Sequence, residues 1–388
     1  MSRRRSERVT IDRQEPPPGI FLARPEPLPE EGISLAIKDL FDTAGLTTTY
    51  GSAIFADHVP EQTAEAVRRL EAAGYANVGK TNLHEFAYGT TSANPHFGAV
   101  PNPVAPGRVA GGSSGGNAAG LALGLADAAL GSDSGGSVRI PAACCGIVGF
   151  KPTYGLVPLE GCFPLAPSFD HAGPMARDVG TCVAIVETLA PGFTPSALES
   201  LEELTVGVAW LDDADPLVRA RVEEVAARFP RRRRLDVPFP EAIGAVFMRE
   251  VADIHRELYA EQAELYGENV ATKIERCLAV TDEEYRQALA ARESYRERLL
   301  ELLDSIDLLL TPTLPCVAPP AAQDELTIRE TLIRFTYPFN AIGAPALALP
   351  CGPAEEGLPA SAQLVGKPGD DALVLAAGAL ITSAGRPS

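Results

Sequence analysis

Residues 111–152 read GGSSGGNAAGLALGLADAALGSDSGGSVRIPAACCGIVGFKP and hold two loops of glycine and serine on either side of an apolar segment. Glycine lets the first loop, residues 111–116, bend in ways that other residues resist. The second loop, residues 131–137, can turn several backbone N–H groups toward one small space where an oxyanion would bind. Between them, the small and apolar residues 117–130 predict a tightly packed, buried helix. The stretch therefore predicts a loop that carries a nucleophile.

The same residues resemble the pattern of the amidase signature family, in which GGSSGGS, a helix of small residues and GSDTGGS precede R-x-P-A and C-G-x-x-G-x-K-P. The departures are Asn117, Ser134 and Cys144, where the family usually has Ser, Thr and an aromatic residue. None of these three is a chemical residue of the family. The resemblance implies that Ser137 is the nucleophile that accepts the acyl group. It also implies that Ser113, whose peptide bond is cis in the family, bridges the nucleophile to a base.

A lysine ends the strand that the mostly apolar residues 32–39 predict. Lysine is scarce in this chain, which has five lysines among its 33 basic residues. Arginine stays protonated, whereas a lysine withdrawn from water can lose its proton near neutral pH and act as a base. Taken alone, a lysine such as Lys38 more often reaches into solvent at the end of a strand. The sequence IKD around it, with GS at residues 51–52, resembles the lysine motif of the family and implies that Lys38 is the catalytic base.

Residues around the nucleophile are expected to bind the oxyanion and the substrate. Arg139 lies in an apolar run, where a lone cation needs a partner, so we expect it to pair with Asp133. Binding of a substrate carboxylate is the alternative role for this arginine. The residues predicted to hold the oxyanion through their backbone N–H groups are Ser134, Gly135 and Gly136. The residues predicted to bind substrate are Ser114, Asp133 and Arg139.

Other catalytic constellations fit the sequence less well. The first loop matches the G-x-S-x-G elbow of Ser-His-Asp hydrolases, with Ser113 as nucleophile and His171 as base. An elbow follows a strand, but prolines interrupt residues 101–109. Neither loop continues into the Gly-Lys-Ser/Thr of a P-loop. His84 and Glu85 lack a second histidine at ligand spacing, so no metal and no cofactor is expected.

Composition restricts the partners and the location of the protein. The formal net charge of −18 argues against nucleic acid or an anionic membrane, because phosphate binding depends on clustered cations. The basic run at residues 231–234 is expected to be a solvated turn. No run of about eighteen uncharged apolar residues is present, which predicts a soluble protein. The seven cysteines show no CxxC or Cys/His spacing and predict reduced thiols in the cytoplasm.

Strands alternate with helical segments throughout the chain. This pattern predicts an α/β fold with a central mixed, twisted β-sheet covered by helices on both faces, which agrees with the amidase signature fold. Apolar spacing predicts helices at residues 62–74 and 216–227, and two or three long surface helices in a variable region at about 242–303. We expect residues 1–29 to be a flexible leader without a secretion signal. Residues 30–388 are expected to form a single amidase signature domain.

The resemblance implies hydrolysis of linear amides. Lys38 would take a proton from Ser113, which takes one from Ser137 as its oxygen attacks the amide carbonyl. An acyl-enzyme would release ammonia or an amine and then a carboxylic acid. A small-molecule amide is the expected partner, and a homodimer stays open. Two alternatives within the family are the glutaminase-type A subunit of a tRNA-dependent amidotransferase, which the short chain disfavours, and an allophanate or carbamate hydrolase.

Overall fold

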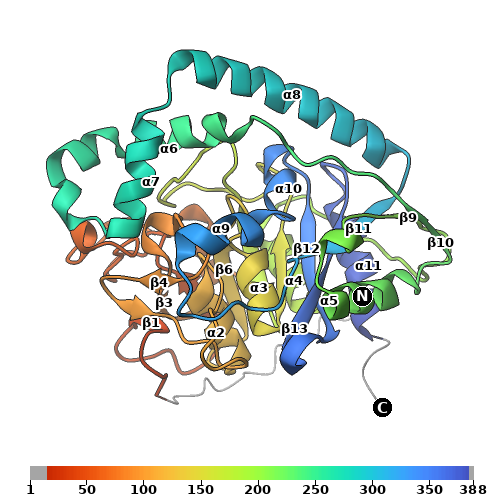
Figure 1. Ribbon diagram of the computed structural model, residues 1–388. Helices are drawn as coiled ribbons and strands as arrows, with labels where there is room; N and C mark the ends of the chain where they lie inside the picture. The colour runs from red at the N-terminus through yellow and green to blue at the C-terminus, as the bar shows by residue number, and fades with distance from the viewer. Residues whose placement is uncertain (1–14, 384–388) are drawn as a thin grey trace.

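A mixed β-sheet runs through the computed structural model, which describes residues 15–383. Its eleven strands follow the order β1, β3, β2, β6, β8, β7, β12, β13, β11, β9, β10. Parallel pairing joins β2 to β3 and β6, and β9 to β10 and β11, while the other pairs are antiparallel. The predicted α/β fold with a mixed sheet is confirmed (Figure 1). The strands are β1 (Phe21–Ala23), β2 (Ile33–Lys38), β3 (Tyr75–Thr81), β6 (Ala128–Ser132), β7 (Val148–Lys151), β8 (Ala172–Ala176), β9 (Thr205–Val208), β10 (Arg231–Arg234), β11 (Leu308–Pro312), β12 (Ala346–Pro353) and β13 (Pro359–Val365).

Helices cover both faces of the sheet. Successive strand residues point to opposite faces, so Leu347 and Ala348 of β12 belong to different layers. Ala348 packs in the layer of α2 (Gly115–Ala122) and α3 (Arg139–Cys145), whose small side chains allow close approach. Leu347 packs in the layer of α4 (Val179–Leu189), α5 (Pro216–Ala226) and α11 (Asp371–Ser383). Helix α1 (Glu65–Ala72) packs against β2 together with α4.

A third group of helices lies beyond the sheet edge at the top of Figure 1. It consists of α6 (Gly244–Gln262), α7 (Glu268–Leu278) and the long α8 (Asp282–Asp304), and it matches the predicted helical region. A capping box at Thr281 and Glu284 satisfies the first N–H groups of α8. Two shorter helices, α9 (Glu325–Ile333) and α10 (Tyr337–Ala341), lie between this group and the sheet (Figure 1). Within residues 15–383, no helix combines the length and the apolar character needed to cross a bilayer.

The parallel strands β2 and β6 decide where the site lies. Parallel strands end at the same edge of a sheet, so Lys38 at the end of β2 and Ser132 at the end of β6 come together. The loops that follow these strands, and the first turn of α2, meet at this edge. The sheet therefore positions side chains that lie far apart in the sequence.

The single helix predicted for residues 117–130 is wrong. The helix α2 ends at Ala122, and Gly124 follows with a φ of +74°, in the left-handed region that ends helices. The chain then forms β6, all five residues of which are buried between β2 and β8. A run of small apolar residues suits a buried strand as well as a buried helix, and the pairing partners decide between them.

Two further expectations need correction at the ends of the sheet. Part of the predicted flexible leader belongs to the fold, because Ile20 is buried and β1 pairs with β3, with Phe21 opposite Thr81. Residues 1–14 lie outside the described residues, and the single domain stays a prediction. The basic run is the edge strand β10 instead of a turn, since its backbone pairs with β9 while its four side chains stay exposed.

Candidate active site

Lys38 is the last residue of β2 and is fully buried. Its Nζ donates hydrogen bonds to the Ser113 Oγ at 2.6 Å and to the Ser132 Oγ at 2.8 Å. Burial lowers the pKa of Lys38 to about 7, so the neutral amine is well populated near neutral pH. The structure thus brings the predicted base and the predicted bridging serine into direct contact.

A second buried lysine, Lys80, has different surroundings. Its Nζ lies 2.9 Å from the Asp39 Oδ1 and 2.7 Å from the Thr48 Oγ1. A carboxylate this close favours the charged form of an amine. Lys38 forms no ion pair with any described residue, and two hydroxyl groups contact its amine. Of the two lysines, Lys38 therefore has the better surroundings for accepting a proton.

The predicted nucleophile Ser137 ends the loop between β6 and α3. It lines a small cavity together with Ser134 and Gly135, and the described residues leave its hydroxyl without a hydrogen bond. The link from the Ser137 Oγ to the Ser113 Oγ is therefore not formed in this structure. The two loops are nevertheless adjacent, since the N–H of Ser114 donates to the Ser137 carbonyl at 3.2 Å. The Gly112–Ser113 peptide bond is cis, as the resemblance implied.

The backbone N–H groups of this loop divide into two sets. The N–H of Gly136 donates to the Asp133 Oδ1 at 2.8 Å, and the N–H of Val138 donates to the Asp133 Oδ2 at 3.1 Å. The Gly136 N–H is thus already used in this structure, and the predicted contribution of Gly136 to the oxyanion site stays a prediction. Within the described residues, the N–H groups of Ser134, Gly135 and Ser137 donate no hydrogen bond, and all three residues line the cavity.

A buried ion pair supports the loop from behind. The Arg139 Nη2 lies 2.8 Å from the Asp133 Oδ1, and the Arg139 Nε donates to the Asp133 Oδ2 at 3.0 Å. The remaining Arg139 donors reach the Thr336 carbonyl, the Gln363 Oε1 and the Asn340 Oδ1 at 2.7–3.0 Å. Although burial alone would raise the pKa of Asp133, the guanidinium holds that pKa well below its usual range. The expected pairing of Arg139 with Asp133 is present.

The three residues predicted to bind substrate lie in this supporting layer. Ser114, Asp133 and Arg139 are fully buried, and none of them lines the cavity. The Ser114 Oγ donates to the Ser132 carbonyl at 3.3 Å, and Arg139 has a partner for each of its three nitrogens. The structure does not bring these side chains to the surface that a substrate would meet.

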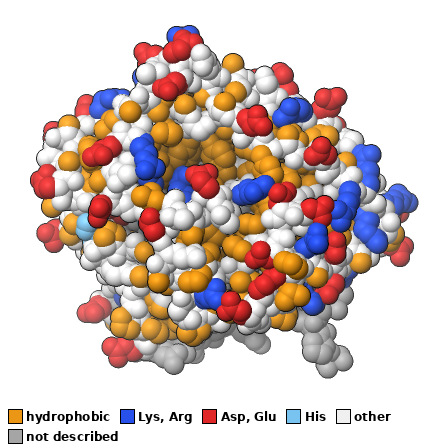
Figure 2. Space-filling model, in the orientation of Figure 1, with side chains coloured by type: hydrophobic (Ala, Val, Ile, Leu, Met, Phe, Trp, Pro, Cys, Tyr) orange, Lys and Arg blue, Asp and Glu red, His pale blue; other side chains and the backbone are white. Residues whose placement is uncertain are grey.

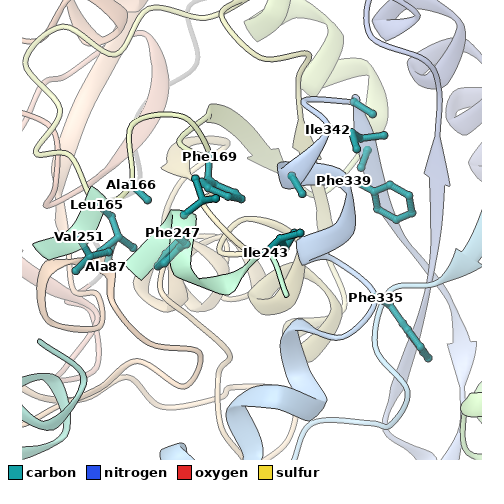
Figure 3. Close-up of a cluster of buried hydrophobic side chains, with 14 of the residues drawn as sticks. Ala87, Leu165, Ala166, Phe169, Ile243, Phe247, Val251, Phe335, Phe339 and Ile342 are labelled. Atoms are coloured by element: carbon teal, nitrogen blue, oxygen red, sulfur yellow. The ribbon is translucent and has the colours of Figure 1, made fainter. Parts of the chain in front are cut away.

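The small cavity, of about 30 Å³, adjoins an outer cleft of about 880 Å³. Figure 2 shows the hollowed face, with hydrophobic side chains on its floor and charged side chains at its rim. Tyr88, Phe247 and Tyr337 contribute aromatic rings to the wall, and the buried ring of Phe169 packs behind it, 5.4 Å from the ring of Phe247 (Figure 3). The residues that line both the cavity and the cleft are Tyr88, Phe247, Arg329, Ile333 and Tyr337.

Several contributors to the site were missed in the sequence. Ser132 was assigned to a loop after a helix, and its place beside Lys38 depends on the pairing of β6 with β2. Asp170 accepts the Ser134 hydroxyl at 2.5 Å, and the S-x-D pattern at residues 168–170 was the available signal. His171, the base of the elbow alternative, donates from Nδ1 to backbone carbonyls and has no hydrogen bond with Ser113 among the described residues.

Residues 23–375 match the family model described as Amidase. This chain belongs to the amidase signature family. It is therefore a hydrolase that acts on carbon–nitrogen bonds other than peptide bonds. The fold agrees, since a solved amidase structure superposes with a TM-score of 0.84 at 39% identity, covering 91% of this chain and 84% of that one.

Curated relatives within the family carry different activities. The chain is 35% identical over 408 residues to the glutamyl-tRNA(Gln) amidotransferase A subunit of Natronomonas pharaonis, covering 91% of this chain and 96% of that protein. It is 32% identical over 416 residues to the AtzE subunit of the 1-carboxybiuret hydrolase from Pseudomonas sp. strain ADP, covering 99% and 90%. A solved glutamyl-tRNA(Gln) amidotransferase A subunit from Thermotoga maritima has a TM-score of 0.83 at 30% identity, covering 95% and 87%. Chain length does not decide against an amidotransferase role, because this chain spans 96% of the Natronomonas protein, although other amidotransferase A subunits are longer.

Proposed function

We propose that this amidase cleaves the C–N bond of a small amide through Ser137, Ser113 and Lys38. The observation that carries the proposal is the 2.6 Å contact between the buried Lys38 amine and the Ser113 hydroxyl, with a lysine pKa of about 7. A neutral amine has a lone pair that can accept the serine proton. All seven cysteines are free thiols, which supports a location in the cytoplasm.

The proposed reaction moves one proton through two hydroxyl groups. Neutral Lys38 accepts the proton of Ser113, Ser113 accepts the proton of Ser137, and the Ser137 oxygen bonds to the substrate carbonyl carbon. The N–H groups of Ser134 and Gly135, which donate no hydrogen bond within the described residues, would hold the resulting oxyanion. The tetrahedral intermediate collapses, the C–N bond breaks, and the leaving amine takes the relayed proton. Water then attacks the acyl-enzyme by the same route and releases the carboxylic acid.

A glutaminase-type component of an amidotransferase is the second candidate, favoured by the 35% identity and 96% coverage of the Natronomonas protein. Such a component would hydrolyse glutamine and pass ammonia to a partner. Hydrolysis of an allophanate or a carbamate is a third candidate function, and it would use the same three residues. Co-purification of the chain with other subunits in a fixed ratio would favour the amidotransferase, whereas a free-standing amidase is active alone.

The direct test uses a fluorophosphonate probe and the variant Ser137→Ala. We expect the probe to label Ser137, and the variant to lose both labelling and amide hydrolysis while keeping the melting temperature of the wild type. Peptide mapping identifies the labelled serine. Labelling of Ser113 instead would contradict the proposal and support the elbow alternative, in which that serine is the nucleophile.

A further inference from the structure

The Arg329 side chain of α9 is 22% exposed, and part of its guanidinium has no hydrogen-bond partner. Its Nε is buried and has no hydrogen-bond partner, and its Nη1 donates only to the Glu330 Oε1 at 3.1 Å. The Glu330 side chain is 80% exposed, so this contact competes with water and contributes little. Arg329 lines both the small cavity beside Ser137 and the outer cleft.

A second donor on the same wall is also unused. The hydroxyl of Tyr337 is buried and has no hydrogen-bond partner, although its ring is held by stacking on Phe169 at 5.5 Å. Like Arg329, Tyr337 lines both the cavity and the cleft. Buried polar groups in native proteins are nearly always satisfied, so two unsatisfied donors on one wall indicate a ligand that accepts from both.

The surrounding structure holds Arg329 in place. One helical turn before it, Glu325 pairs with Lys273 of α7 at 3.0 Å and accepts the N–H of Thr90 at 3.0 Å. Residues four apart on a helix share a face, so these contacts fix the turn from which Arg329 extends. The Arg329 Cζ also lies 5.7 Å from the centre of the Tyr88 ring. The cation is thus positioned by its neighbours, while its buried Nε stays without a partner.

The charges of the cavity indicate an anion as the missing partner. Of the described residues that line the small cavity, Arg329 alone is charged. Four cationic and three anionic side chains line the outer cleft, in a chain whose net charge is −18. The ion-pair partner of the guanidinium is an exposed carboxylate, and a substrate carboxylate would add a charge-assisted hydrogen bond to the buried Nε, which has no partner.

We infer that Arg329 and Tyr337 bind a carboxylate in the acyl part of the substrate, so that the substrate is the half-amide of a short dicarboxylic acid. The inference rests on the proposed function, because the cavity is identified by Ser137. A small cavity that holds both groups places the carboxylate within a few bonds of the scissile carbonyl. No acidic side chain lines this cavity, so an α-ammonium group, as in free glutamine, finds no partner there.

Binding to the variant Ser137→Ala tests the inference without turnover. The ligands are malonamate, succinamate and glutaramate, the corresponding uncharged diamides, and L-glutamine, each titrated by calorimetry. We expect at least one half-amide to bind roughly ten to a hundredfold more tightly than its diamide, the range expected for a hydrogen bond to a charged group. Glutaramate is expected to bind more tightly than glutamine, which differs from it by the ammonium group.

Second substitutions in the same background locate the binding group. Arg329→Gln is expected to reduce the preference for the half-amide to below about threefold, and Tyr337→Phe to weaken half-amide binding by about threefold to tenfold through loss of one hydrogen bond. Arg276→Gln is the matched control, because it removes the same charge from the outer cleft but not from the small cavity. Melting temperatures check that each variant is folded, and Tyr337→Phe loses no internal hydrogen bond.

Three outcomes would overturn the inference. They are equal binding of half-amides and diamides, an unchanged preference in Arg329→Gln, and an equal loss of preference in Arg276→Gln. Failure of the proposed function is a separate result, since it appears as missing hydrolysis and missing Ser137 labelling in the wild type. A chain that binds half-amides but hydrolyses no amide would retain this inference and lose the catalytic proposal.

Discussion

Two arginines lie on opposite sides of the nucleophile loop and differ in their hydrogen-bond partners. Arg139, behind the loop, is fully buried and has five hydrogen bonds to protein acceptors. Arg329, on the cavity wall, has a buried Nε without a partner and one contact with an exposed carboxylate. A guanidinium has five N–H donors, and unused buried donors are unfavourable. The protein itself satisfies every nitrogen of Arg139, whereas the Nε of Arg329 has no partner in the protein and is available to a ligand.

The buried amine of Lys38 has hydroxyl partners but no ion-pair partner among the described residues. Substitution of this lysine gives the largest effect that we expect. Raising the pH through about 7 removes the proton from the Lys38 amine, so the acylation rate should rise and then level off. Lys38→Arg keeps the charge but cannot accept a proton, and should lower that rate by about 10²–10⁴-fold. Pre-steady-state measurement of acylation from pH 5 to 10, a range chosen to span the pKa of about 7, checks both expectations.

A charged lysine that only supports the structure would behave differently. Lys38→Arg would then keep much of the activity, with the pH profile of the wild type. Activity above a tenth of wild type with that profile would return the search for the base to the five histidines. The melting temperature of the variant separates loss of the proton acceptor from loss of the fold.

The contact between Lys38 and Ser113 could be predicted from the sequence because both residues lie within dense local motifs, and the catalytic roles of the proposed triad stay a prediction. The pairing of Arg139 with Asp133 was also predictable, since the two residues are six apart and the arginine had no other nearby anion. The contacts of Gly136 and Ser132 could not be predicted from the sequence. The Gly136 contact depends on which carboxylate accepts its N–H group, and the place of Ser132 depends on which strands pair. Such information lies in tertiary contacts.

The residues that line the small cavity could not be predicted from the sequence, for a related reason. Tyr88, Ser137 and Arg329 come from three segments separated by dozens of residues, and none of the motifs quoted above includes Arg329. Whether an arginine is satisfied depends on every acceptor within reach, which only the folded structure shows. From the sequence, Arg139 was the candidate for binding a substrate carboxylate. From the structure, we infer that Arg329 has this role instead.

The next prediction concerns the stability that Arg139 provides. Arg139→Gln should lower the free energy of unfolding by about 3–5 kcal/mol, because it leaves the Asp133 carboxylate buried and unpaired. The depressed pKa of Asp133 means that the pair stabilises the fold above the unfolded carboxyl pKa of about 3.9. That contribution is lost as the pH falls, so the difference between variant and wild type should shrink in acid. Denaturant unfolding at pH 7 and pH 3 measures it.

An opposite result would reverse the roles of the two arginines. A folded Arg139→Gln variant with unchanged stability and a large rise in KM would make Arg139 a substrate contact. The loop geometry argues against this result, because Asp133 also holds the N–H groups of Gly136 and Val138. Loss of its counter-ion should therefore disturb the nucleophile loop as well as the fold.

The smallest effect is expected from the same substitution at the other arginine. Arg329→Gln should change the free energy of unfolding by less than about 1 kcal/mol, since it breaks no buried ion pair and removes a donor that was already unsatisfied. Removal of the unsatisfied Nε donor opposes the lost packing on Tyr88, so the two contributions partly cancel. Unfolding of both variants in the same denaturant series compares their changes in the free energy of unfolding directly. A loss comparable to that of Arg139→Gln would mean that the wild-type protein already supplies Arg329 with an internal partner, and the distinction between a satisfied and a ligand-binding arginine would fail.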